Sequence, residues 1–566
     1  MAEYLSPGVY VEEFDSGGQP LTGVSTSTAG FIGVAQRGAI DGLPVLITSM
    51  NDFRRNFGSY LSENQFGAYR YLAYGVEHFF TNGGSRAYVM RVAPTDAKAA
   101  LNKEGALQIT ARNPGSWGNA IQVMLEATSK AKTQIYEVVG DKKYRVKNHA
   151  GFQAGDVVAF DAGGDKIYAS VLSSRDNVIE LSVALGDNVV DNGLIPSKLL
   201  STCEFTLTAV YGDEVETFEK CSLNAQAPNY VDKVVARSNL IQVKASTKGY
   251  NSQHPLAFIG GEQGQTSFSL VGGTDGSLGA LGPANYIGED HGPGKRTGIQ
   301  AFIDNDQVSI MAIPGVTEPS IQLALVAHCE LLGSRFAILD LPREKTKVPD
   351  VLAIKDLFDS SYAALYNPWL QVFDPLEKRN IFIPPSGSIS GIYARSDSTR
   401  GVEKAPANEV VRGCTGLDVQ YNKGEQDILN PKGVNLIRNF SGQGIRVWGA
   451  RTTSSNAQWK YINIRRLFIF LEESIKAGTN WVVFEPNDER LWARVQRTID
   501  AFLTRVWRGG ALMGASPAEA FYIDISRNTM TQDDIDNGRL ICVIGVAPIK
   551  PAEFVIFRIT QKTNEQ

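Results

Sequence analysis

The chain lacks the features of a membrane, secreted or nucleic-acid-binding protein. No apolar run approaches the ~20 residues that a membrane-spanning helix needs, and the segment Met1–Pro7 lacks the positive and apolar regions of a signal peptide. The 5 cysteines are widely spaced and never form a C-x-x-C pair, which favours buried thiols and excludes a cysteine-rich zinc module. The net charge is only -5 over 566 residues, without a long basic run. We therefore expect a protein made in the cytosol, with no direct membrane insertion and no direct nucleic-acid partner.

Motifs for common enzyme chemistries are incomplete. Gly294-Lys295 lacks the leading glycine of a phosphate-binding loop. The run Gly387–Gly391 has the outline of a nucleophile elbow but carries Ile389 where the attacking serine belongs. The run Asp533–Gly538 resembles a calcium loop but has isoleucine where an oxygen ligand is required. The five histidines show no metal-ligand spacing. We expect no cofactor and no metal ion.

Two aspartates keep an enzymatic interpretation open. Asp340 and Asp374 fall near the carboxyl ends of predicted strands, where open α/β sheets place their ligands. A proline follows each within two residues, which favours a turn or a helix cap over catalysis. An α/β-fold enzyme of the hydrolase or nucleotide-binding type is therefore the alternative to the structural function argued below.

Hydrophobic patterns predict an α/β (α+β) multidomain protein with a β-rich insert. Strands at residues 27–35 and 86–92 flank a helix that ends at Asn82-Gly83-Gly84. From about residue 107 to residue 276, short strands alternate with Gly, Asp and Asn. A βαβ unit over residues 308–340 resumes the α/β pattern, and a helix at 351–358 and a strand at 370–373 extend it. We thus predict a mixed-sheet core formed by the N- and C-terminal parts of the chain. The predicted divisions are an N-terminal linker arm (1–24), a first core part (25–97), an insert of one or two β-rich domains (98–277), a second core part (278–545) and a C-terminal linker arm (546–566).

Both chain ends have the pattern of a β-strand without a hairpin partner. Alternating faces run through residues 554–560, and a Pro7-Gly8 turn precedes the N-terminal strand. Such free edges promote aggregation unless another subunit completes the sheet. Because donor and acceptor surfaces differ, this contact is head-to-tail and can propagate into a helical polymer; the alternative is that each arm folds back on its own domain. The residues expected to form intersubunit arms are Val9, Tyr10, Val11, Glu12, Phe554, Val555, Ile556, Phe557, Arg558 and Ile559.

A helix predicted from Asp488 to Arg508 has one apolar and one cationic face. The helix dipole opposes arginine near the N-terminal end, so helix stability does not explain the whole row. We expect this face to dock onto an acidic protein surface; the alternative is an ordinary solvated charged face. The row, interrupted only by Ala501, consists of Arg490, Arg494, Arg497, Arg505 and Arg508.

Short motifs resemble, in order along the chain, those of contractile tail sheath proteins. In the C-terminal part they are Pro385-Ser386-Gly387, Arg400-Gly401-Val402, Lys404–Asn408, Leu429-Asn430, Gly433-Val434-Asn435, Gly444–Thr452, Trp459–Arg466, Phe484-Glu485-Pro486-Asn487 and Pro551-Ala552-Glu553-Phe554. Nearer the N-terminus they are Ser6–Tyr10, Gly30–Gly33 and Phe79–Gly84, and the insert matches only at Asn113–Asn119 and Gly272–Gly276. Glu403 and Asn367 depart from the family pattern, in which tryptophan and tyrosine are common at these positions.

The resemblance implies a structural subunit, and not an enzyme, of a sheath that polymerises helically in stacked rings around an inner tube. Contraction would drive the tube through a target cell envelope as the subunits change from one packing to another. The helix 488–508 would face the inner tail tube protein, the arms would link neighbouring subunits, and the insert would lie on the outer surface. Baseplate and tail terminator proteins are the other implied partners. The implied location is the host bacterial cytoplasm during assembly, then a virion tail or an extracellular contractile particle.

Overall fold

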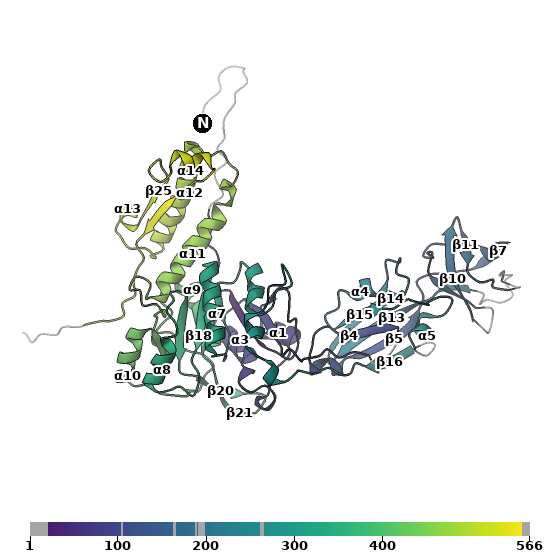
Figure 1. Cartoon of the computed structure of the whole chain (residues 1–566), viewed down its shortest axis with the longest axis horizontal. Coiled ribbons are helices and arrows are strands. Elements are labelled where there is room, and N and C mark those ends of the chain that lie inside the picture. Colours follow the sequence, from purple (N-terminus) through teal and green to yellow (C-terminus); the bar gives the residue numbers. More distant parts are fainter. Residues whose placement is uncertain are drawn as a thin grey trace, which may run out of the picture.

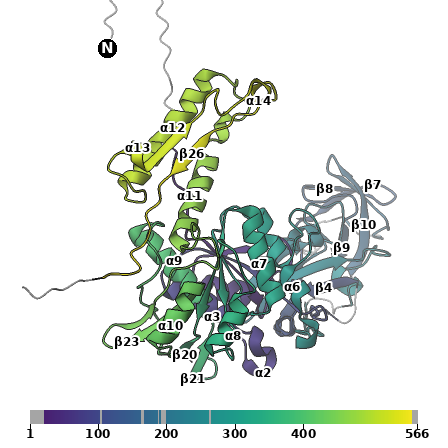
Figure 2. The ribbon, with the colours of Figure 1, turned by 60° about the vertical axis from the view of Figure 1, so that its left-hand side comes forward.

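The structure, a computed structural model, describes residues 21–102, 106–161, 166–186, 189–190, 199–260 and 265–556. An α/β domain occupies the middle of the molecule (Figure 1). The β-rich insert extends from it in one direction, and a C-terminal unit of helices and a small sheet rises from it in another, as the turned view also shows (Figure 2). The predicted multidomain, mixed-sheet fold class is confirmed.

The α/β domain is built on one eight-stranded sheet to which both parts of the chain contribute. The strand order is β2-β3-β1-β17-β18-β19-β23-β24, parallel except for the two edge strands β2 and β24. N-terminal Ala29 lies opposite both Ala87 and Ile310, so β1 joins the two parts directly. All six residues of β1 are buried, as expected for a strand covered on both faces. The strands are β1 (Ala29–Val34), β2 (Val45–Ile47), β3 (Ala87–Val92), β17 (Ile310–Ala312), β18 (Phe336–Asp340), β19 (Ala363–Asn367), β23 (Val434–Phe440) and β24 (Gly444–Val447).

Helices cover both faces of this sheet and give it two hydrophobic cores. One face carries α1 (Met50–Phe57), α3 (Leu72–Thr81) and α9 (Ser386–Arg400), and the other carries α6 (Pro283–Ile287), α7 (Pro319–Leu332), α8 (Val348–Lys355) and α10 (Lys423–Leu429). Helices α3 and α9 approach closely because both have glycine at the crossing. A Cβ atom added to Gly387 would lie 2.5 Å from the Cα atom of Gly75. The crossing therefore requires a side chain no larger than hydrogen.

One predicted strand does not extend this sheet. Residues 370–373 fall in β20 (Leu370–Asp374), which pairs with β21 (Arg379–Ile383) and β22 (Gly416–Leu417) in a separate three-stranded sheet. The hairpin partner β21 is nearby in sequence, and antiparallel pairing with it replaces addition to the parallel sheet. The expectation that this strand enlarges the core sheet is therefore wrong.

The insert contains two β-rich units with separate hydrophobic cores. The first unit comprises the sheets β14-β13-β5-β16 and β15-β4, and the second is the seven-stranded sheet β6-β12-β9-β10-β11-β8-β7. At the junction, the Nζ atom of Lys130 lies 2.8 Å from Asp156 and 3.6 Å from Glu204, and both carboxylates are 1% exposed. The chain enters the insert near Thr95 and returns to the α/β domain near Ala280. These two points lie side by side, and the Thr95 amide donates a hydrogen bond to the Ala280 carbonyl at 3.3 Å.

The elements of the insert have the following bounds. The first unit contains β4 (Leu107–Ala111), β5 (Gln122–Thr128), β13 (Glu204–Tyr211), β14 (Glu214–Cys221), α4 (Val231–Val235), β15 (Ile241–Ala245), α5 (Pro255–Phe258) and β16 (Gln265–Ser269). The second unit contains β6 (Lys132–Thr133), β7 (Ile135–Gly140), β8 (Lys143–Val146), β9 (Val157–Asp161), β10 (Lys166–Arg175), β11 (Val178–Leu181) and β12 (Leu199–Thr202).

The C-terminal unit packs its helices and a two-stranded sheet around a core of its own. Its elements are α11 (Ile462–Gly478), the 3₁₀ helix η6 (Asn480–Val482), α12 (Glu489–Arg508), α13 (Pro517–Ala520), β25 (Phe521–Asp524), α14 (Gln532–Asp536) and β26 (Val543–Val546). The predicted helix 488–508 is confirmed as α12, with Asp488 as N-cap accepting a hydrogen bond from the Leu491 amide at 2.8 Å. Among the described helices, none is long and apolar enough to span a membrane.

Candidate functional site

Glu553 fixes the point at which the C-terminal segment leaves the body of the molecule. The Nε and Nη2 atoms of Arg451 donate to its two carboxylate oxygens at 2.8 and 2.7 Å, as a two-pronged, charge-assisted contact. Asn430 and Tyr461 add hydrogen bonds of 2.7 and 3.0 Å. Burial alone would raise the pKa of Glu553, but these hydrogen bonds outweigh it and hold the pKa below its usual value. We call these four residues the Glu553 clamp.

The segment after the clamp is exposed and apolar. Phe554, Val555 and Ile556 are 73%, 68% and 78% exposed, and they form no strand. Over these residues the chain does not fold back on its own domain but leaves the body (Figure 1). Residues 554–556 form no strand within their own chain, and a strand here would need a partner for its backbone groups. The remaining predicted residues of this arm, Phe557, Arg558 and Ile559, lie outside the described residues.

The N-terminal segment is also anchored where it joins the body. Leu21 is 2% exposed within the core of the C-terminal unit. The carbonyl oxygen of Leu21 accepts a hydrogen bond from the Nη2 atom of Arg505, and Val24 donates its amide to Ser474 at 3.1 Å. The Nη2 atom of Arg466 donates to the carbonyl oxygen of Thr26 at 2.9 Å. The predicted N-terminal arm residues Val9, Tyr10, Val11 and Glu12 lie outside the described residues.

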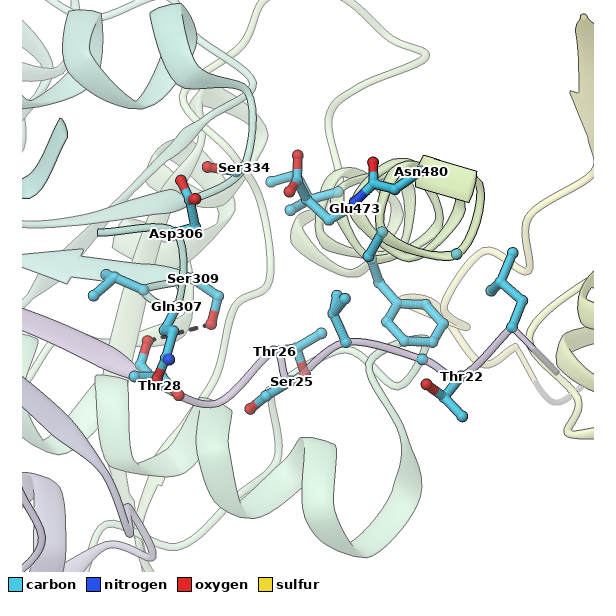
Figure 3. Close-up of a pocket in the computed structure, with 18 of the residues that line it drawn as sticks. Thr22, Ser25, Thr26, Thr28, Asp306, Gln307, Ser309, Ser334, Glu473 and Asn480 are labelled. Atoms are coloured by element: carbon cyan, nitrogen blue, oxygen red, sulfur yellow. Dashed lines mark hydrogen bonds between the residues drawn. The ribbon is translucent and has the colours of Figure 1, made fainter. Parts of the chain in front are cut away.

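A cavity of about 630 Å³ lies beside this N-terminal segment. Figure 3 shows residues 22–28 passing along one side, with Glu473 and Asn480 on another side and Asp306, Gln307 and Ser334 across from them. The lining is a mixture of apolar, hydroxyl, amide and carboxylate side chains. Among the described residues, no group of three or more His, Cys, Asp and Glu side chains could hold a metal ion. The cavity thus offers space next to the anchored segment, without a recognisable catalytic constellation.

The two-stranded sheet of the C-terminal unit has a free edge on each side. β25 and β26 pair antiparallel from Phe521 opposite Val546 to Asp524 opposite Val543, and the described residues supply no third strand. Tyr522 is 60% exposed and Val543 is 41% exposed. An edge of this kind presents unpaired amide and carbonyl groups to an additional strand.

The arginine row predicted on α12 lies on the solvent side of the helix. All five side chains are exposed, and among the described residues none of them forms an ion pair with a carboxylate. The guanidinium of Arg494 lies 4.6 Å from the centre of the Trp481 ring, and Arg497 donates to the Ala493 carbonyl at 3.3 Å. Arg505 is partly committed elsewhere, since it holds Leu21. We call Arg490, Arg494, Arg497, Arg505 and Arg508 the arginine face.

The two candidate catalytic aspartates have structural roles. Asp340 accepts hydrogen bonds from the amide and hydroxyl of Ser386, at 2.9 and 2.6 Å, and from the Gly315 amide at 3.1 Å. Ser386 begins α9, so Asp340 caps that helix, and burial raises the pKa of Asp340 to about 6. Asp374 accepts from the Leu376 amide at 2.8 Å within a turn. The turn and cap interpretation is therefore confirmed for both residues.

Sequence reasoning missed the Glu553 clamp and the anchoring function of Arg505. The motifs Leu429-Asn430, Gly444–Thr452, Trp459–Arg466 and Pro551–Phe554 contain all four clamp residues, but no local pattern indicates that they meet. Arg451 is separated from Glu553 by 102 positions, and Arg505 from Leu21 by 484. Only their membership in separate motifs could have indicated a shared role.

Comparisons with known proteins point to one family. The phage tail sheath protein central domain matches residues 290–453, and the phage tail sheath C-terminal domain matches residues 454–562. A putative prophage major tail sheath protein of Pseudomonas aeruginosa is 26% identical over 285 residues, which span 48% of this chain and 71% of that protein. A tail sheath protein of Vibrio phage KVP40 is 27% identical over 210 residues, which span 36% of this chain and 30% of that protein.

Two solved structures share the fold over almost the whole chain. The sheath complex of an extracellular contractile injection system, in the contracted state, is 20% identical with a TM-score of 0.53 and covers 99% of both chains. The contracted helical sheath of the anti-feeding prophage is 22% identical with a TM-score of 0.53 and covers 98% of this chain and 99% of that one.

Proposed function

We propose that this chain, which belongs to the contractile tail sheath family and is a structural subunit of a contractile sheath, polymerises by exchanging its terminal arms with neighbouring copies around an inner tube. The particle is a phage tail or an extracellular contractile particle, assembled in the host bacterial cytoplasm. The role is structural and involves no enzymatic step.

One observation carries the proposal of arm exchange. The Glu553 clamp holds the base of the C-terminal segment rigidly, whereas Phe554, Val555 and Ile556 directly after it are exposed. A flexible tail would need no four-residue clamp, and a segment that belonged to its own domain would be buried. This combination suits a strand that is delivered to another subunit.

The free edges of β25 and β26 are suitable acceptors for such strands. Strand addition there would give the arm its main-chain hydrogen bonds, and exposed Tyr522 and Val543 would provide apolar contacts. We propose that residues 9–12 and 554–559 occupy edges of this kind on neighbouring copies. Because the arm and the acceptor are different surfaces, a head-to-tail contact between them is heterologous and can propagate into a helix.

We further propose that the arginine face of α12 lies on the inner tail tube protein. These guanidinium groups are exposed and form no ion pair in the part of the chain that the structure describes, which favours an acidic partner surface. Contraction would then exchange one packing of rigid subunit bodies for another while the anchored arms keep the subunits connected. The insert, residues 98–277, would lie on the outer surface, and baseplate and terminator proteins would bind the two ends of the polymer.

Removal of residues 554–566 tests the arm. The shortened chain keeps the Glu553 clamp, so its thermal unfolding and circular dichroism should match those of the full chain. We expect the full chain to form hollow, striated tubes in negative-stain micrographs and the shortened chain to remain monomeric. Equal polymerisation of both would contradict the proposal.

The substitution Arg497→Glu tests tube docking. Arg497 is exposed, and among the described residues its side chain donates one hydrogen bond, within its own helix, so we expect a charge reversal to leave the fold intact. We expect weaker cosedimentation with inner tubes isolated from the particle, and unchanged binding for Arg112→Glu, a matched exposed arginine on the insert. Unchanged binding of Arg497→Glu would refute docking through this face.

A further inference from the structure

A tight turn before α12 presents a phenylalanine in an unusual backbone conformation. The Glu485 amide donates to the Val482 carbonyl at 3.1 Å, which closes a four-residue turn. Val483 has φ -67° and ψ 130°, and Phe484 has φ 71°. These angles define a type II turn, whose third residue needs a positive φ and is normally glycine or asparagine. Phenylalanine at this position is destabilising.

Folding of the single chain does not explain why phenylalanine occupies this position. Phe484 is 103% exposed and Val483 is 62% exposed, so neither side chain contributes to a core. Glycine would satisfy the turn better and would expose less apolar surface. A strained backbone that displays a large apolar side chain is a feature of binding sites, where a partner supplies the missing contacts.

The turn is held rigidly between two elements. The Oδ1 atom of Asn487 accepts a hydrogen bond from the indole Nε1 of Trp492 on α12 at 2.8 Å. The Nδ2 atom of Asn487 donates to the Arg539 carbonyl, in the loop after α14, at 3.1 Å. The backbone that follows the turn is therefore anchored by the fold before any partner arrives, which lowers the entropic cost of binding.

The turn is also next to the arginine face. Trp481, three residues before Phe484, has its ring 4.6 Å from the guanidinium of Arg494. Three residues span at most about 10 Å, so the turn that carries Phe484 lies beside the part of the arginine face that contains Arg494. The same partner would thus meet an apolar knob and a row of positive charges.

We propose that Phe484, supported by Val483, is the apolar anchor of the interface with the inner tube protein, and that it inserts into an apolar depression bordered by acidic side chains. This inference rests on the proposed docking of the arginine face and adds a residue that determines its affinity. Buried aromatic side chains at the centre of an interface typically dominate the binding energy, while surrounding charges set orientation and rate. A neighbouring sheath subunit is the competing occupant of the same surface.

The substitution Phe484→Gly separates binding from folding because the two effects have opposite signs. Glycine accepts the positive φ, so thermal stability of the full chain should be unchanged or higher. Affinity for inner tubes isolated from the particle should fall by about 30-fold or more, the loss typical of an interface hot spot. The measurement is cosedimentation at subunit concentrations below those at which the chain polymerises alone. Phe484→Asn should behave in the same way, and Phe373→Ala, at a 58% exposed phenylalanine on β20, should bind normally.

Each alternative result has a distinct meaning. Normal tube binding by Phe484→Gly would overturn the anchor, as would a lower melting temperature, which would give the ring a structural role. Reduced polymerisation in the absence of tubes would assign Phe484 to a contact between sheath subunits and would also overturn it. If Arg497→Glu weakens tube binding and Phe484→Gly does not, the anchor alone fails. If the unmodified chain does not sediment with tubes, the proposed docking itself fails.

Discussion

The Glu553 clamp makes a quantitative prediction for Glu553→Gln. Glutamine keeps the shape and one acceptor oxygen but loses the two charge-assisted bonds to Arg451, whose side chain is 11% exposed and would be left without its counter-charge. Hydrogen bonds to charged groups are worth about 1.5–3 kcal/mol, and the 19% exposure of Glu553 moderates this value. We expect the base of the arm to open more easily by about 2 kcal/mol, which is about a 30-fold rise in the open population.

Hydrogen exchange measured by mass spectrometry on the peptide that spans residues 545–556 would report this opening directly. Exchange should accelerate there by about 30-fold, while Glu344→Gln, at an exposed glutamate of the α/β domain, should leave it unchanged. Combining the change with Arg451→Met should add little further acceleration, because the two side chains act as one unit. Unchanged exchange in Glu553→Gln would refute the idea that this carboxylate anchors the arm.

Acidification should open the same clamp. The pKa of Glu553 is lowered in the folded chain, so its stabilising effect is present above the ordinary value of 4.5 and is lost as the pH falls through the lowered value. Exchange in residues 545–556 should therefore accelerate below about pH 4.5. Glu553→Gln should lack this acceleration, and an identical pH profile in both proteins would contradict the assignment.

Three further changes test the interior. Lys130→Met leaves two buried carboxylates unpaired and should destabilise the insert by about 3 kcal/mol or more in calorimetry, whereas Lys132→Met, at an exposed lysine, should not. Because the pKa of Asp340 is raised from 3.8 to about 6, the folded state gains stability as the pH falls through this range. We therefore compare the unfolding free energies of the native protein and of Asp340→Asn, measured in urea titrations. The difference between them should grow by up to about 3 kcal/mol in favour of the native protein from pH 7 to pH 4. A difference that does not change with pH would refute this. Gly387→Ala should destabilise the α/β domain by about 1–3 kcal/mol, because its Cβ would lie 2.5 Å from Gly75; unchanged stability would show that the helices can separate.

Local sequence pattern was sufficient to predict the helices and strands that have a clear hydrophobic period and clear end residues. The amphipathic period and the Asp488 cap predict α12 to within one residue. Residues 27–35 and 86–92 contain β1 and β3, because short apolar runs bounded by turn residues are typical of buried strands. The arginine row lies on the exposed face because residues spaced by three or four share one side of a helix.

The remaining features depend on contacts that no local pattern encodes. Membership of β20 in a second sheet is decided by its pairing with β21. The clamp on Glu553 and the bond from Arg505 to Leu21 join residues that are 102 and 484 positions from each other. The positive φ of Phe484 could not be predicted from the sequence either, since phenylalanine rarely adopts a positive φ. These contacts became apparent only in three dimensions, and they include the residues with the strongest functional implications.

The base of the insert has a consequence for how such a chain can be modified. The Thr95 amide and the Ala280 carbonyl are hydrogen-bonded at 3.3 Å. In the eight-stranded sheet, β1 pairs with β3, which precedes the insert, and with β17, which follows it, so the sheet does not pass through the insert. We expect that the residues between Thr95 and Ala280 can be replaced by another domain, such as an enzyme or an antigen, without cutting the sheet, with loss of the hydrogen bonds from Arg37 to Glu214 and from Arg91 to the Pro114 carbonyl. A polymer of these subunits would then display one guest domain per copy at regular spacing.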